Sequence, residues 1–344
     1  MSRLSRTLST ALVAAASLCI AQGAVGQDKK PVELRYTTGA PAKTPWVMQL
    51  ERFEKDVDEE GKGALKIQSF HSAQLGNEQD TVQQVARGRI DMGGFSSGSV
   101  ALIAPEIALL GLPFYFASIA EQDCVIDEHL SKPVAALLAK KGIQFLGWTE
   151  VGTVDVVGKK PYLTPADVKG LKAAAASHRV SSGMWSALGA NPTPIGITEI
   201  SSAFQTGLVD VNATVVTFYL PSGLAKAAPV MTRVEMSDAP GIILMNKANY
   251  DKLSAENKAA LNKAVARRPA AQLRAEIRGF EETLRGMHVK AGGTIVQTTP
   301  AQREEWRKLL QPVWPAMVKD VGGESANIFQ LMEAGKKACG DRKS

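Results

Sequence analysis

The sequence has few of the residues and motifs from which catalytic centres are built. It contains only three cysteines and four histidines in 344 residues, and the histidines are scattered, with no HExxH motif. Glycine-rich phosphate loops are also missing, since residues 61–63 lack the P-loop spacing and no GxGxxG segment opens a helix. We therefore expect no cofactor and no metal, and we favour a binding protein over an enzyme.

Strong charge and long apolar runs are absent as well. Lysine and arginine exceed aspartate and glutamate by only six residues, with no dense basic run, so no nucleic-acid partner is predicted. Beyond the N-terminal region, the most apolar segment is residues 107–120, which Pro113 interrupts and which falls short of the roughly 20 residues of a membrane-spanning helix. With 45% hydrophobic and 22% charged residues, the composition is that of a globular protein.

The N-terminus has the layout of a secretory signal peptide. Arg3 and Arg6 precede an apolar run over residues 8–20, and small residues follow up to Gly26. This pattern predicts a signal peptide over residues 1–26, cleaved near Gly26, and a periplasmic location. Cys19 lies in the apolar run, but the preceding Leu18 argues against lipid attachment.

Two cysteines would remain after cleavage, Cys124 and Cys339. An even number in an oxidising compartment permits one disulfide that closes a very long loop, and two unconnected thiols are the alternative. Their spacing excludes a CxxC redox or metal motif.

The pattern of apolar residues predicts an α/β protein. Residues 32–36, 65–70 and 90–95 have the character of strands, and helices are expected to begin at Pro45 and after Asn77. Strands that alternate with helices indicate βαβ units and a largely parallel sheet. The length is too great for one ordinary core and predicts two lobes.

A short motif occurs twice. Gly88 and Gly207 each end a predicted helix, and Asp91 and Asp210 each follow three residues later at the entrance of a strand, the second of which is expected over residues 209–219. The same turn used once in each lobe explains the repetition, with both aspartates as turn or cap residues rather than ligands.

Residues 164–219 carry a set of ordered motifs. These are Lys169-Gly170-Leu171-Lys172, Met184-Trp185, Ala187-Leu188-Gly189-Ala190, Pro192-Thr193-Pro194 and Gln205-Thr206-Gly207-Leu208-Val209-Asp210. The stretch resembles the substrate-binding proteins of TRAP (tripartite ATP-independent periplasmic) transporters. Further matches, among them Gln74-Leu75-Gly76-Asn77-Glu78 and Leu146-Gly147-Trp148, extend the resemblance over nearly all of the chain after the signal peptide.

The resemblance implies a two-lobed periplasmic-binding-protein-like (type II) fold. Each lobe would be a mostly parallel sheet flanked by helices, with crossovers near residues 150 and 240 and a long bridging helix. Lobe 1 would comprise residues 27–150 plus about 240–270, and lobe 2 residues 151–239 plus about 271–344. The implied role is a monomeric receptor that captures a small molecule between its lobes and delivers it to the membrane permease subunits of a TRAP transporter, which an ion gradient drives.

The resemblance also locates a ligand clamp that this chain has lost. Most members of the family bind a ligand carboxylate with an arginine two residues after the Lys-Gly-Leu-Lys motif, because a guanidinium matches a carboxylate bidentately. Here that position is Ala174, and the position of a second common arginine is Val154. The pocket asparagine of the family is replaced by Thr214.

Two explanations follow. The one we favour is a ligand that is not a simple carboxylate, because burying an unpaired carboxylate costs several kcal/mol. Glu150 would share a strand face with Val154 and give the pocket an acid, which suits a cationic, neutral polar or aromatic ligand. In the alternative, a relocated cation, either His178 or Arg179, or else His71, holds a carboxylate.

Other candidates come from matching positions or from residue type. Ser96 and Ser177 lie where related proteins contact ligand, while Trp46, Phe218 and Asp238 are placed at strand ends or in the first loop. An alternative of another class is a secreted serine hydrolase, because residues 94–98 match G-x-S-x-G around Ser96.

Overall fold

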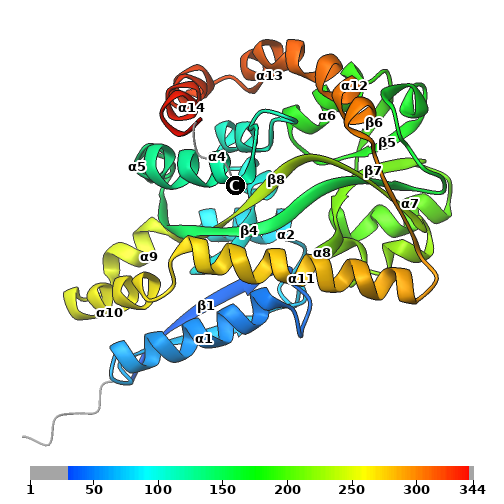
Figure 1. Ribbon diagram of the computed structural model, residues 1–344. Helices are drawn as coiled ribbons and strands as arrows, with labels where there is room; N and C mark the ends of the chain where they lie inside the picture. Colours follow the sequence, from blue (N-terminus) through cyan, green and yellow to red (C-terminus); the bar gives the residue numbers. More distant parts are fainter. Residues whose placement is uncertain (1–29, 341–344) are drawn as a thin grey trace, which may run out of the picture. The chain divides into compact units, whose positions relative to one another are not determined.

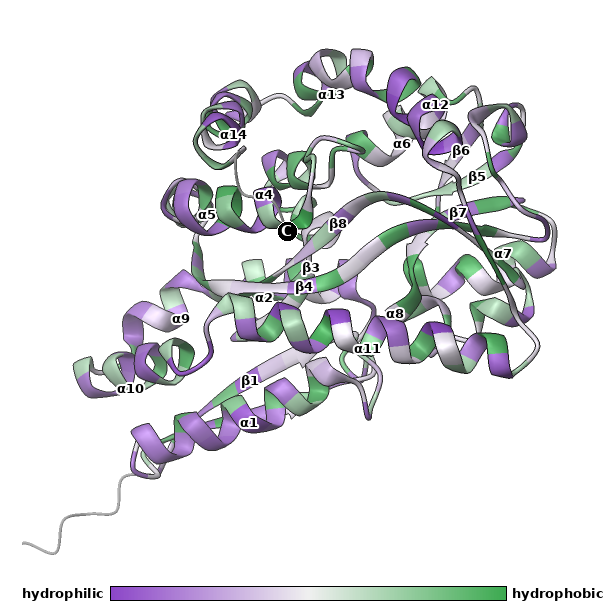
Figure 2. Ribbon diagram, in the orientation of Figure 1, coloured by the Kyte–Doolittle hydropathy of each residue, from purple (hydrophilic) through white to green (hydrophobic). Residues whose placement is uncertain are grey.

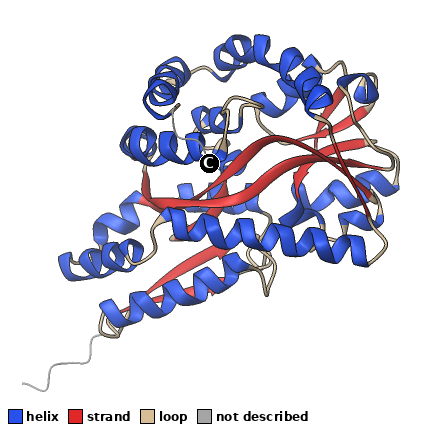
Figure 3. Ribbon diagram, in the orientation of Figure 1, coloured by secondary structure: helices blue, strands red, loops and turns tan. Residues whose placement is uncertain are grey.

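The computed structural model of the protein describes residues 30–340, and the predicted signal peptide lies outside the described residues. Strands and helices alternate along this part of the chain, as the sequence predicts (Figure 3). The strands are β1 (Val32–Thr38), β2 (Leu65–Phe70), β3 (Met92–Ser96), β4 (Ile143–Gly158), β5 (Lys172–Ala175), β6 (Asn191–Pro194), β7 (Val211–Val215), β8 (Val230–Asn246) and β9 (Thr294–Gln297).

Helices surround these strands (Figure 1). They are α1 (Pro45–Glu60), α2 (Glu78–Ala86), α3 (Ser97–Val100), α4 (Ile119–Cys124), α5 (Ser131–Lys140), α6 (Arg179–Ala187), α7 (Ile200–Gln205), α8 (Val216–Tyr219), α9 (Lys247–Lys252), α10 (Ala255–Ala266), α11 (Ala270–Lys290), α12 (Pro300–Leu310), α13 (Trp314–Val321) and α14 (Ser325–Cys339). None of the helices within residues 30–340 combines the length and the apolar character that crossing a bilayer requires.

The strands form one mixed sheet in the order β2-β1-β3-β8-β4-β7-β5-β6, with β9 added beside β8. Pairing is parallel within each outer group, β2-β1-β3 and β7-β5-β6, and antiparallel where β8 and β4 join these groups. The α/β class and the mostly parallel character of each half are thus confirmed, while the lobe boundaries stay a prediction.

The two longest strands connect the halves of the sheet. β4 and β8 have 16 and 17 residues and pair antiparallel, with Thr149 opposite Gly241 near the middle of both. The predicted crossovers near residues 150 and 240 coincide with this pairing. The 21-residue helix α11 lies across β4 and also contacts α1, α8 and β9 (Figure 1).

The longer helices bury apolar residues against the sheet or a neighbouring helix. In α1 the buried residues include Leu50, Phe53 and Val57, which follow a helical spacing, and most of the exposed positions are charged (Figure 2). Pro45 begins this helix, where its missing N–H is not needed. The Asn77 side chain caps α2 by accepting a hydrogen bond of 2.8 Å from the Asp80 backbone N–H, as the sequence predicts.

The repeated glycine turn has the same structure at both of its positions. Gly88 and Gly207 have positive φ angles of 72° and 71°, which favour glycine. Asp91 accepts a hydrogen bond of 2.8 Å from the backbone N–H of Arg35, and Asp210 accepts one of 3.0 Å from that of Lys172. Each aspartate therefore ties a helix–strand turn to the neighbouring parallel strand, which confirms the predicted structural role.

One predicted strand is wrong in its length. Residues 209–219 were expected to be extended throughout, but β7 ends at Val215 and the next four residues form the helical turn α8. The Thr217 hydroxyl donates a hydrogen bond of 2.7 Å to the Val151 carbonyl oxygen, and the Tyr219 hydroxyl donates one of 2.6 Å to the Ala228 carbonyl oxygen. These tertiary bonds outweigh the local preference of β-branched and aromatic residues for a strand.

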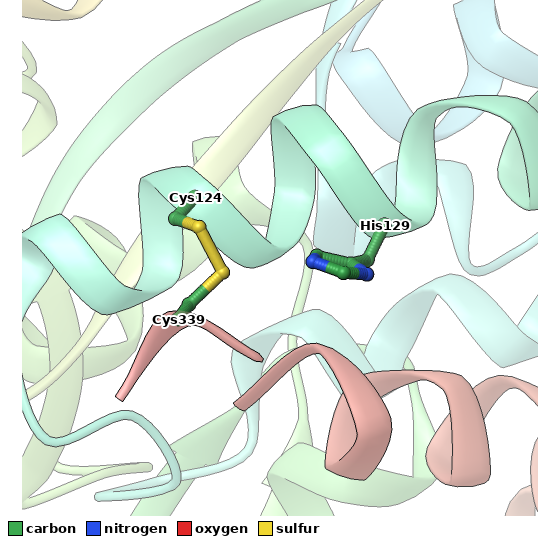
Figure 4. A group of neighbouring side chains, drawn as sticks. All are labelled: Cys124, His129 and Cys339. Atoms are coloured by element: carbon green, nitrogen blue, oxygen red, sulfur yellow. A yellow bond between two sulfur atoms is a disulfide. The ribbon is translucent and has the colours of Figure 1, made fainter. Parts of the chain in front are cut away.

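Cys124 and Cys339 form a disulfide, which resolves the alternative that the sequence leaves open. It joins the end of α4 to the end of α14 across 215 residues (Figure 4). His129 lies beside the two sulfur atoms, but thiols held in a disulfide are not free to bind a metal as thiolates (Figure 4).

Candidate ligand-binding site

A cavity of about 370 Å³ lies where β1, β3, β4 and β8 meet α1, α6, α8 and the start of α2 and α3. This volume is in the range of small-molecule pockets. Six of the nine predicted site residues line it: Trp46, Ser96, Glu150, Val154, Thr214 and Phe218. Their direct contact with a ligand stays a prediction.

Glu78 and Ser96 line the polar end of the cavity, and Ser99 binds Glu78 from behind the wall. The Ser96 hydroxyl donates a hydrogen bond of 2.9 Å to Glu78 Oε2, the Ser99 hydroxyl donates one of 2.7 Å to the same oxygen, and the Ser96 backbone N–H donates to Oε1. Burial raises the pKa of Glu78, and the bonds from Ser96 and Ser99 oppose that rise. No ion pair joins Glu78 to a described cationic side chain, so this acid faces the cavity without a counter-charge.

His178 lies at the same end and caps α6. Its Nδ1 accepts a hydrogen bond of 3.3 Å from the Ser181 backbone N–H, which requires an unprotonated Nδ1. Burial lowers the pKa of His178 to about 4, so the imidazole is neutral near pH 7. His178 lines the cavity but brings no positive charge to it.

Glu150 lines the cavity but is bound by an arginine on α11. Arg278 donates to both Glu150 carboxylate oxygens, at 3.0 and 2.5 Å, and also binds Asp123 bidentately at 2.7 and 2.9 Å. The Glu150 side chain is 3% exposed, and its backbone carbonyl accepts a hydrogen bond of 2.7 Å from the Trp46 indole. Glu150 is therefore an internally paired acid, not the free acid of the pocket that we hypothesised.

The positive charges that line the cavity are also accounted for. Besides Glu78, Glu150 and His178, the only acidic or basic side chain among the described lining residues is Arg268. Its Nε donates a hydrogen bond of 2.8 Å to Asp56, and its Nη2 lies 2.7 Å from the same carboxylate oxygen. Within residues 30–340, the cavity wall thus has no cation without a carboxylate partner.

The three positions at which the resemblance predicts clamp residues, Val154, Ala174 and Thr214, differ in their surroundings. Val154 on β4 and Thr214 on β7 both line the cavity, and Thr214 pairs with Asp155 of β4. Ala174, on β5, does not line the cavity. It is 2% exposed and packs in a cluster that includes Val157 and Phe204.

Two other predicted residues also lie outside the cavity wall. Ser177 is exposed, and its hydroxyl accepts a hydrogen bond of 3.2 Å from the Gln79 amide. Asp238 is buried, and the Thr153 hydroxyl donates a hydrogen bond of 2.9 Å to its carboxylate. Asp238 does not line the cavity because side chains alternate along β8: its neighbours Ser237 and Ala239 line the cavity, and Asp238 lies on the other face.

The geometry gives the hydrolase alternative no support. Ser96 does follow a strand and precede a short helix, but its hydroxyl is bonded to Glu78 and caps α3 through the Ser99 backbone N–H at 3.2 Å. Among the described residues no histidine is hydrogen-bonded to Ser96. Arg179, one candidate for a relocated cation, is exposed and does not line the cavity.

Several lining residues were not predicted from the sequence. Tyr36 and Thr149 are 6% exposed, and no hydrogen bond joins the hydroxyl group of either residue to another described residue. For Glu78 the sequence does hold a signal, an acidic residue in the first turn of a helix within a family motif. For Tyr36 it holds none, because an apolar residue in a strand gives no indication of which face adjoins a cavity.

The fold and the cavity define an α/β solute-binding protein. The chain belongs to the family described as bacterial extracellular solute-binding protein, family 7 (DctP), which matches residues 36–320. It is 29% identical over 212 residues to the 2,3-diketo-L-gulonate-binding periplasmic protein YiaO of Escherichia coli, an alignment that covers 61% of this chain and 65% of that relative.

Solved structures show the same fold. A TRAP periplasmic solute-binding protein from Roseobacter denitrificans, with bound β-D-glucuronate, superposes with a TM-score of 0.81 at 26% identity, covering 89% of this chain and 99% of that one. One from a Bradyrhizobium species, in complex with D-galacturonate, gives a TM-score of 0.82 at 27% identity, covering 89% and 100%. The ligands of both neighbours are carboxylate anions.

Proposed function

We propose that the protein is a periplasmic receptor of the TRAP type that captures a small molecule without a free carboxylate and delivers it to an ion-gradient-driven permease. The ligand is cationic, neutral polar or aromatic. One observation carries this proposal: the described wall of the cavity has an acid without a counter-ion, Glu78, and no cation without a partner.

Electrostatics explains why such a wall disfavours a carboxylate. A carboxylate taken out of water needs a charged partner to offset the loss of hydration. Arg268 already binds Asp56, Arg278 already binds Glu150 and Asp123, and His178 is neutral. Glu78 would repel a ligand carboxylate and attract a ligand ammonium group. Aromatic lining residues such as Trp46 and Phe218 would stack on an aromatic or cationic group of the ligand.

A thermal-shift screen with matched compounds tests this proposal. Benzylamine, benzyl alcohol and benzoate share one ring, as do 2-phenylethylamine, 2-phenylethanol and phenylacetate, and the members of each set differ mainly in charge. A ligand in hundredfold excess over its Kd stabilises the folded state by about 2.7 kcal/mol. We expect the amines and alcohols to raise the melting temperature and the carboxylates to leave it unchanged.

The outcome that contradicts the proposal is equally specific. If carboxylates, including glucuronate, raise the melting temperature and the amines do not, the ligand is an acid, and Arg268 is then the cavity cation to substitute first. The delivery step is tested separately, by uptake of a confirmed ligand into proteoliposomes that contain the permease subunits, with and without this protein and an ion gradient.

A further inference from the structure

The cavity extends from its polar end into the space between the sheet and helices α1 and α10. Six lining residues in this region belong to, or pack against, a core cluster formed by β1, β3, β4, β8, α1 and α10: Tyr36, Leu50, Phe53, Leu146, Ile243 and Val265. We call this set the apolar arm. Glu78, Ser96 and His178 are not part of that core cluster, so the two ends of the cavity differ in chemistry.

Two strand glycines leave room for the arm. A Cβ atom on Gly147 would lie 3.9 Å from Val265 Cγ1, with no other described atom within 4 Å outside its neighbours in the chain. A Cβ on Gly94 would lie 2.5 Å from the Tyr36 hydroxyl oxygen, so the tyrosine side chain occupies the place of a missing side chain. A β-bulge between Phe145 and Gly147 adds to this effect, because it shifts the register of β4 against β8 at the same point.

The arm contains one polar group with no described partner. The Tyr36 hydroxyl belongs to a residue that is 6% exposed, it forms no hydrogen bond with another described residue, and the side chain lines the cavity. Burial raises the pKa of Tyr36, so the phenol is a neutral hydrogen-bond donor. A ligand oxygen beside Tyr36 in the cavity would accept the hydrogen bond that this hydroxyl donates to no described residue.

We propose that the apolar arm is a subsite that holds the aromatic or branched aliphatic body of an elongated ligand, with a carbonyl or ether oxygen of the ligand at the Tyr36 hydroxyl. This inference rests on the proposed function for the other half of the ligand, whose amine or neutral polar head lies near Glu78. A ligand with a head and a long apolar body explains why one cavity combines a charged end with walls of leucine, isoleucine, valine and phenylalanine.

A neutral fluorescent probe tests the arm without knowledge of the natural ligand. N-phenyl-1-naphthylamine has two aryl groups and no charge, and its emission rises in apolar surroundings. Gly147→Leu places a side chain in the arm against Val265, and Gly279→Leu is the matched control, since Gly279 is exposed on α11 with open space around it. We expect the wild type and Gly279→Leu to bind one probe per chain, and Gly147→Leu to bind it at least tenfold more weakly.

Two results would overturn the proposal: no probe binding to the wild type, or equal binding by Gly147→Leu and Gly279→Leu. Circular dichroism and the melting temperature show whether Gly147→Leu is folded. If it is not, Val265→Trp fills the arm from the α10 side and should weaken binding of the probe to the same extent.

Competition against the probe tests the role of Tyr36. 2-Acetylnaphthalene carries a carbonyl oxygen that 2-ethylnaphthalene lacks, at nearly the same size. We expect the ketone to displace the probe from the wild type three- to tenfold better than the hydrocarbon, and Tyr36→Phe to abolish this difference. A difference that persists in Tyr36→Phe would show that the hydroxyl does not take part.

The arm and the proposed function fail in different ways. If the probe does not bind while small amines and alcohols still raise the melting temperature, the arm is wrong and the proposed function stands. If the probe binds in the arm but carboxylates are the compounds that stabilise the protein, the arm stands and the proposed ligand class is wrong.

Discussion

The ion-pair network between α11 and its neighbours differs from the adjoining cavity in how its charged side chains are paired. Arg274 and Arg278 of α11 form ion pairs with Asp123, Asp127 and Glu150, at distances between 2.5 and 3.4 Å. In the cavity, Glu78 is held by hydroxyl and backbone groups and has no described cationic partner. Glu150 belongs to both regions, since it lines the cavity and binds Arg278.

This difference shows that the number of charges near a cavity does not determine what binds there. Several arginines lie close to the cavity of this protein, yet each of those next to it is neutralised by a carboxylate of the chain itself. A charged ligand responds to the charge that remains after internal pairing. At the polar end, Glu78 is the lining acid that has no cationic partner among the described residues.

The largest expected effect comes from breaking the network beneath α11. Arg278→Met leaves Glu150, whose side chain is 3% exposed, and Asp123 without this partner. Removing one member of a buried ion pair strands the other charge, so we expect a loss of about 3 kcal/mol in the free energy of unfolding. Urea denaturation of the two proteins measures this loss.

The control for this variant is Arg307→Met. Arg307 pairs with Glu304 on the surface of α12, with side chains 48% and 35% exposed, and such pairs contribute about 1 kcal/mol or less. Adding Glu150→Gln to Arg278→Met should restore part of the loss. Equal losses for Arg278→Met and Arg307→Met would mean that the network is no more important than a surface pair.

The second effect is a pH dependence at the polar end of the cavity. The pKa of His178 in the folded protein is about 4, against an ordinary value of 6.5, so the folded state resists protonation. Its contribution to stability is complete above pH 6.5 and is lost as the pH falls towards 4. A pKa shift of this size contributes at most about 3 kcal/mol to the free energy of unfolding. We expect about 2 kcal/mol because the His178 ring is only partly buried.

His178→Asn isolates this contribution. Asparagine keeps a side-chain acceptor for the Ser181 backbone N–H but does not titrate. Urea denaturation at pH 7 and pH 4.5 should show a smaller loss of stability on acidification in the variant than in the wild type. The carboxylates with raised pKa values act in the opposite direction in both proteins, so they cancel in this difference. Identical pH profiles would contradict the assignment of a neutral imidazole to His178 in the folded protein.

Much of the fold was predictable because local chemistry specifies it. The alternation of strands and helices, the Asn77 cap and the two glycine turns at Gly88 and Gly207 each depend on residues close together in the sequence. The exception is the strand expected over residues 209–219, where bonds to distant residues such as Val151 end β7 early.

The site was predictable only in outline, because charge pairing and side-chain direction depend on distant parts of the chain. Glu150 is bound by a residue 128 positions away, which no local pattern reveals. The space of the apolar arm depends on Gly147 facing α10 across a bulge in β4, and the sequence alone does not place that bulge. The resemblance did locate Val154 in the cavity wall, although the loss of an arginine clamp there stays a prediction.

The third effect concerns Glu78 as the acid without a counter-charge. Glu78→Gln keeps an oxygen to accept hydrogen bonds from the serines but removes the charge. We expect the affinity for benzylamine to fall about tenfold, or about 1.4 kcal/mol, and that for benzyl alcohol to stay the same. Isothermal titration calorimetry measures both. Asp80→Asn is the control, since it removes an exposed charge from the same helical turn, and equal losses for amine and alcohol would contradict the role of Glu78.

The smallest expected effect is the return of a cation to the cavity. Val154→Arg places a guanidinium at a lining position where the resemblance predicts a second, common arginine. Ala174, the predicted position of the main arginine, is enclosed by an apolar cluster and is the poorer place for one. We expect phenylacetate to bind about fivefold more tightly, a gain of roughly 1 kcal/mol. We expect a modest gain because the variant adds only one positive charge. That charge lies in the same cavity as Glu78 and can pair with this acid instead of the ligand. Val154→Met adds similar length without charge, and calorimetry that finds the same gain for both variants would show that packing, not charge, limits carboxylate binding.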